Sequence, residues 1–140
     1  MARALVLMGS GETSPTMVTP HQQILKSVSG KKLILDTPYG FQENANELTE
    51  KIRSYFEVNV GIKAEEARLR SKIDRPADIA SAIANINSAE WVFTGPGSPT
   101  YALKTWRVTG ASEALKNLLM RGTLVVSSAA ALTEIGRAHV

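Results

Sequence analysis

The sequence alternates short apolar runs with segments of helical periodicity along its length. Apolar runs that end abruptly at Gly, Pro, Ser or Asp are typical of strands buried on both faces, whereas apolar residues spaced by three and four indicate amphipathic helices. We interpret five runs as strands, at residues 4–8, 32–35, 91–94 and from 123, with a weaker one at 67–69. We expect five helices, at residues 19–30, 43–56, 76–86, 101–106 and 112–120.

This alternation predicts an α/β fold. Right-handed connections between parallel strands place helices on both faces of a sheet, so we expect a three-layer α/β/α arrangement with a mainly parallel, flavodoxin-like sheet. A chain of 140 residues is large enough to bury the core of one domain, here residues 1–140. Sites in such sheets form at the carboxyl ends of the strands, so the loops after four of the strands should meet at one edge.

The composition excludes several classes of function. The chain has no cysteine, which removes thiol nucleophiles, disulfides and thiolate metal sites and fits a cytoplasmic protein. A net charge of +3 with scattered Lys and Arg gives little support for nucleic-acid binding. The first apolar run is too short for a secretory segment or a membrane span.

No cofactor or catalytic metal is expected. The loop Gly9-Ser10-Gly11 lacks the third glycine of a dinucleotide fingerprint, and Glu12 would repel a phosphate there. The two histidines, His21 and His139, are not accompanied by clustered carboxylates or cysteines, so a metal site is not indicated.

The stretch TLVVSSAAAL at 123–132 is the strongest candidate for chemistry. A buried strand that runs into Ser128 and then into small residues is the pattern of a nucleophile elbow. The amide of Ala129 would begin a helix and face an oxyanion formed beside Ser128. An alternative interpretation is a buried strand followed by a serine that caps a helix.

Other loops at the same edge supply partners for Ser128. Gly97, in the turn Gly95-Pro96-Gly97, has an amide that could complete an oxyanion hole, although the turn could equally be an ordinary strand-to-helix connection. Glu12 is a candidate acid or orienting group, or else a solvated loop residue. A serine needs a base, and His21 in the first helical turn is the candidate, against the alternative of a surface histidine.

Several segments resemble one family of serine peptidases. FTGPGSPTYALKTW, SEALKNLLMRG and LVVSSAAAL are similar, in order and spacing, to the Gly-Gly-Asn-Thr loop, the helix and the Ser-Ala-Gly-Ala elbow of the dipeptidase E and cyanophycinase family. The first two strands, LVLMGSGE and LILDTPYGFQEN, also resemble those of its members. The family has the class I glutamine amidotransferase-like fold, and the resemblance implies Ser128 as nucleophile with Ala129 and Gly97 as oxyanion donors.

Members of that family continue past the elbow into a segment that carries the catalytic acid and histidine. The resemblance therefore implies that residues 1–140 are the N-terminal part of a longer family domain. Two hypotheses follow. The chain is a serine hydrolase acting on a small peptide or amide, or it is a catalytically inactive module that binds a small molecule or a partner. A shortened sheet exposes an edge, so self-association into a homo-oligomer is expected for either.

Overall fold

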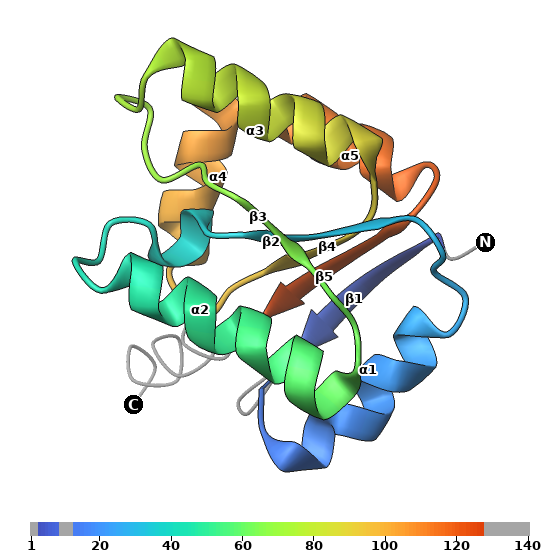
Figure 1. Cartoon of the computed structure of the whole chain (residues 1–140). Coiled ribbons are helices and arrows are strands. Elements are labelled where there is room, and N and C mark those ends of the chain that lie inside the picture. The colour runs from blue at the N-terminus through green and yellow to red at the C-terminus, as the bar shows by residue number, and fades with distance from the viewer. Residues whose placement is uncertain (1–2, 9–12, 128–140) are drawn as a thin grey trace, which may run out of the picture.

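The computed structural model describes residues 3–8 and 13–127, in which a central sheet lies between two layers of helices (Figure 1). Five strands form the sheet, in the order β1-β5-β4-β2-β3, and every pair of neighbours is parallel. The strands are β1 (Ala4–Met8), β2 (Lys31–Leu35), β3 (Glu65–Ala67), β4 (Ala89–Thr94) and β5 (Thr123–Ser127). The α-helices are α1 (Val18–Leu25), α2 (Ala45–Tyr55), α3 (Pro76–Ser88), α4 (Pro99–Thr109) and α5 (Ala111–Leu119).

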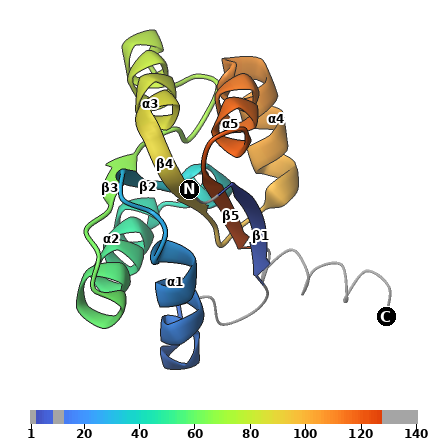
Figure 2. The same cartoon turned by 90° about the vertical axis from the view of Figure 1, so that its right-hand side faces the viewer.

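The two faces of the sheet bury separate apolar cores. Successive side chains of a strand point to opposite faces, so Leu33 and Leu35 of β2 join the core under α3, α4 and α5, whereas Ile34 joins the core over α1 and α2. Figure 2 shows the same division from the side, with β1 and β3 at the two outer edges of the sheet. The runs of consecutive apolar residues in β2 and β4 reflect burial on both faces.

The expected α/β architecture is confirmed, with local differences at the ends of elements. β3 lies at Glu65–Ala67, two residues before the run expected at 67–69. α1 ends at Leu25 and not at Gly30. α5 begins at Ala111 after Gly110, so Ser112 lies inside the helix. α4 begins at Pro99, where the Ser98 side chain accepts a hydrogen bond from the Tyr101 amide at 3.2 Å, which is an N-cap.

The helix after β2 is longer than its apolar stripe predicts. It continues from α2 into a single π-helical turn, η3 (Phe56–Val60), which ends at Gly61 with a φ of 92°. Only glycine adopts this left-handed conformation at little cost, so Gly61 stops the helix. Within the described residues, no helix combines the length and apolar content needed to cross a bilayer.

At the amino-terminal ends of the strands, Arg121 after α5 bonds to the turn between α3 and β4. Its guanidinium donates hydrogen bonds to the carbonyl oxygens of Ile86, Asn87 and Ala89 at 2.8, 2.8 and 2.9 Å. Ile86 and Asn87 lie in the last turn of α3, where carbonyl groups lack the usual partner four residues later, and Ala89 is the first residue of β4. Arg121 therefore ties the segment after α5 to the turn between α3 and β4.

Candidate functional site

Three segments that follow strands meet at the carboxyl edge of the sheet. They are the turn Gly95–Ser98 after β4, the 3-10 turn η2 (Thr37–Tyr39) after β2, and Ser127 at the end of β5. A Cβ added to Gly95 would lie 2.6 Å from the Cβ and the carbonyl oxygen of Ser127. A Cβ added to Gly97 would lie 2.2 Å from the carbonyl oxygen of Pro38. The turn after β4 is therefore held between its two neighbours because both contact positions are glycines.

Hydrogen bonds fix the same arrangement. The Ser98 amide donates to the Pro38 carbonyl oxygen at 2.8 Å. Behind this contact, Trp106 Nε1 of α4 donates to Thr37 Oγ1 at 2.9 Å, and both side chains are buried. The helix that follows the glycine turn is thereby bonded to the turn that follows β2, so one backbone and one side-chain hydrogen bond link the two loops.

The Trp106–Thr37 hydrogen bond gives a first testable prediction. Thr37→Val keeps the shape of the side chain but leaves the indole N–H without its acceptor, and a buried donor without a partner costs about 1 to 3 kcal/mol. We expect urea denaturation to show a loss of that size. Trp106→Phe removes the donor. In a protein that already carries Thr37→Val, Trp106→Phe should therefore lower the free energy of unfolding by less than it does in the wild type. A cost of Thr37→Val within about 0.5 kcal/mol of zero would contradict this account.

A buried ion pair lies beside these turns. Asp36, the residue after β2, accepts hydrogen bonds from Arg70 Nε and from the Leu69 amide, both at 2.7 Å. The Asp36 side chain is 3% exposed and that of Arg70 is 16% exposed. Arg70 also donates to Asn46 Oδ1, and its carbonyl oxygen accepts from the Tyr101 hydroxyl. The pair thus ties the segment after β3 to α2 and α4.

The environment of Asp36 favours the protonated carboxyl more than water does. Burial raises the pKa of Asp36 above its ordinary value, and the hydrogen bonds from Arg70 and Leu69 oppose that rise without cancelling it. Without Arg70, the Asp36 carboxyl would remain buried, and it would lose the hydrogen bond that most strongly opposes the effect of burial. Arg70 is therefore needed to hold a charged Asp36 inside the fold.

The structure describes one of the expected oxyanion donors. Gly97 lies at the carboxyl edge, in the turn bounded by Pro38 and Ser127, and it is half-buried with a φ of 143°. Within the described residues, its amide donates no hydrogen bond. The other expected residues of this group, Ser128, Ala129 and Glu12, lie outside the described residues.

His21 is at a different position from the one that a general base requires. It is fully buried, and its ring makes edge contacts with Tyr55, Phe56 and Phe93 at centroid distances of 5.9, 4.9 and 6.0 Å. The imidazole therefore belongs to the core between α1, α2 and the sheet. This burial gives no support to His21 as the general base, because a fully buried ring offers no surface to a substrate. The alternative of a surface histidine is wrong.

The sequence reasoning did not single out Asp36, Arg70, Thr37 or Trp106. One signal was present, since Asp36 follows a continuous apolar strand directly and therefore had to lie at the carboxyl edge. Within the described residues, no group of three or more His, Cys, Asp or Glu side chains is arranged to hold a metal ion.

Comparisons with known proteins support the fold. No protein-family model matches the chain, and no curated protein matches it. Among solved structures, the chain is similar to the crystal structure of a peptidase from an acI-B1 Actinobacterium, with a TM-score of 0.71 and 18% sequence identity. The match covers 89% of this chain and 53% of the peptidase chain, so the chain spans about half the length of that protein. At this identity the similarity shows a shared fold.

Proposed function

We propose that this chain is part of a peptidase-like serine hydrolase in which Ser128 is the nucleophile. One observation carries the proposal, namely the contact of Gly95 with Ser127, which holds the glycine turn against the end of β5. Ser128 follows Ser127 directly in the sequence, and consecutive Cα atoms are about 3.8 Å apart, which supports a role for its hydroxyl at this edge. The similarity to the fold of a peptidase agrees with this interpretation.

The proposed chemistry is acyl transfer. Ser128 Oγ attacks the carbonyl carbon of a small peptide or amide substrate, and the amides of Gly97 and Ala129 stabilise the oxyanion that forms. The carbon–nitrogen bond then breaks and releases the amine, and water hydrolyses the acyl-enzyme. The Gly97 amide donates no hydrogen bond to the part of the chain that the structure describes, which supports this role, because a donor already engaged elsewhere would be of little use to an oxyanion. Glu12 remains the proposed orienting acid.

A reactive fluorophosphonate tests this proposal directly. We expect the protein, expressed from its complete reading frame, to be labelled, and we expect Ser128→Ala to abolish the labelling. Ser127→Ala is the matched control, since Ser127 is buried and its hydroxyl has no hydrogen-bond partner within the described residues, so labelling should persist. Labelling that is lost in Ser127→Ala instead of Ser128→Ala would contradict the proposal, and so would well-folded protein that is never labelled.

The second candidate function is a non-catalytic binding module. The observation that favours it is the burial of His21, which leaves the described residues without an accessible histidine to activate a serine. Thermal stabilisation of the unlabelled protein by small peptides, without their turnover, would identify this function.

A further inference from the structure

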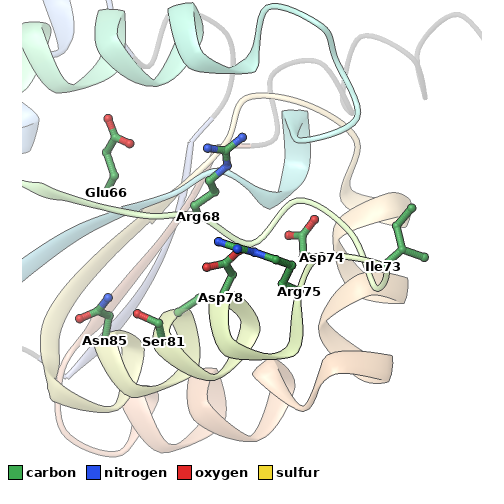
Figure 3. Close-up of a pocket in the computed structure, with 9 residues that line it drawn as sticks. Glu66, Arg68, Ile73, Asp74, Arg75, Asp78, Ser81 and Asn85 are labelled. Atoms are coloured by element: carbon green, nitrogen blue, oxygen red, sulfur yellow. The ribbon is translucent and has the colours of Figure 1, made fainter.

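We propose that the protein forms a two-fold symmetric dimer in which β3 of one copy pairs antiparallel with β3 of a second copy. Within the described residues, β3 is one of the two outer strands of the sheet and pairs only with β2. A surface groove of about 600 Å³ runs along its other side, between β3 and α3 (Figure 3). This inference concerns a surface away from Ser128 and goes beyond the proposed function.

The backbone of β3 has hydrogen-bonding groups available at this groove. The Ala67 carbonyl oxygen accepts from the Asp36 amide at 3.3 Å, so the polar backbone groups of Ala67 point toward β2. Because these groups alternate in direction along a strand, those of Glu66 and Arg68 point the other way, into the groove. Both residues line it. An unpaired row of this kind is a template for a further strand.

The side chains of Glu66 and Arg68 favour a second copy of this chain as the strand that pairs with β3. Glu66 of β3 and Arg68, the residue directly after β3, are both exposed, and their side chains point to the same side of the chain (Figure 3). Neither forms an ion pair within the described residues. If the two-fold axis passes beside Ala67, Glu66 of each copy lies opposite Arg68 of the other. Directly opposite residues of an antiparallel pair share a face, so both ion pairs form at once.

The backbone geometry agrees with the same register. In antiparallel pairing, a hydrogen-bonded pair exchanges two N–H···O bonds, and it is made by residues whose polar groups point at each other. The backbone groups of Glu66 and Arg68 point outward in this way. Ala67, whose backbone groups point toward β2, occupies the non-bonded position on the two-fold axis. One register therefore satisfies both the backbone bonds and the charges.

The wall of the groove formed by α3 leaves space for a partner. The α3 residues that line it are short, namely Asp78, Ser81, Ala82 and Asn85. A symmetric contact places the same patch on both copies, so the two α3 helices would meet through these side chains. Charged residues on an edge strand usually prevent pairing. Here the opposite signs on the two sides of Ala67 instead favour one partner, because an antiparallel copy neutralises both.

Charge reversal provides the test. We expect light scattering after size-exclusion chromatography to give the mass of a dimer for the wild type. Glu66→Arg sets two Arg residues opposite each other in each pair, and Arg68→Glu sets two Glu residues opposite each other. Since like charges directly opposite each other across an interface repel, each variant should raise the dissociation constant by about a hundredfold or more.

Two controls separate charge matching from unfolding. The double variant Glu66→Arg, Arg68→Glu restores the opposite-charge pairs and should dimerise again. An equimolar mixture of the two single variants should form a heterodimer, because one copy then supplies only Arg and the other only Glu. A monomeric wild type, single variants that remain dimeric, or a mixture that stays monomeric would each overturn the proposal.

Discussion

Replacing Gly97 with alanine is expected to destabilise the fold by about 3 kcal/mol or more. The new Cβ would lie 2.2 Å from the Pro38 carbonyl oxygen and 2.8 Å from the Tyr39 amide nitrogen, and both contacts are with backbone that cannot rotate away. The φ of 143° adds strain for any residue with a side chain. We expect a lower urea midpoint with an unchanged slope, since the loss is one of native-state packing.

Gly61→Ala is the matched control for this substitution. Gly61 also has a left-handed φ, of 92°, but a Cβ there meets no heavy atom within 4 Å. Its replacement should therefore cost only the conformational strain, about 1 kcal/mol. The difference between the two variants measures the contact between the turns after β4 and β2. Equal losses in the two variants would show that this close contact does not hold the site together.

Arg70→Met is expected to cost about 3 to 5 kcal/mol at neutral pH. Methionine keeps much of the packing of the arginine stem, but Asp36 loses its ion pair while remaining buried. Arg75→Met is the control, because the Arg75 side chain is 83% exposed and its pair with Asp78 lies in water. That loss should stay within about 0.5 kcal/mol. Urea denaturation of both variants provides the comparison.

The loss in Arg70→Met should depend on pH. Without the arginine, the pKa of Asp36 rises further above its ordinary value of 3.8, because burial is no longer opposed by that hydrogen bond. The folded state then binds the proton more tightly than the unfolded state, so stability falls as the pH rises from 3.8 through the folded pKa. The deficit relative to the wild type should therefore shrink in acid.

Measurements of both proteins at about pH 4 and about pH 7 test this sign. Asp36→Asn combined with Arg70→Met removes the titrating group, so the pH dependence of the deficit should disappear in the double variant. A deficit that grows in acid, or one that persists unchanged at both values, would contradict the role given to Asp36.

Much of the layered architecture could be predicted from the sequence because three strands, β2, β4 and β5, are buried on both faces. Two apolar runs fit only the interior of a sheet, namely Leu33 to Leu35 and Trp91 to Phe93. β3 was harder to place, since an outer strand of three residues that begins with two exposed glutamates carries almost no periodic signal. Its position follows from pairing with β2, which is a tertiary contact.

The burial of His21 could have been predicted from the sequence. Ile24 and Leu25 mark the buried side of α1, and His21 precedes them by three and four residues. Those spacings put it on the same side of an α-helix. The Asp36–Arg70 pair could not be found in this way, because 34 residues separate the partners and only the fold brings them together.

Each apolar core contains one of the two tryptophans. Trp91 lies in the core with α1 and α2, and Trp106 lies in the core with α3, α4 and α5. Intrinsic fluorescence can therefore report separately on the two halves of the molecule when either indole is replaced by phenylalanine. Emission changes that coincide in the two single-tryptophan proteins would show that both layers melt as one cooperative unit. Separate changes would reveal which layer loosens first.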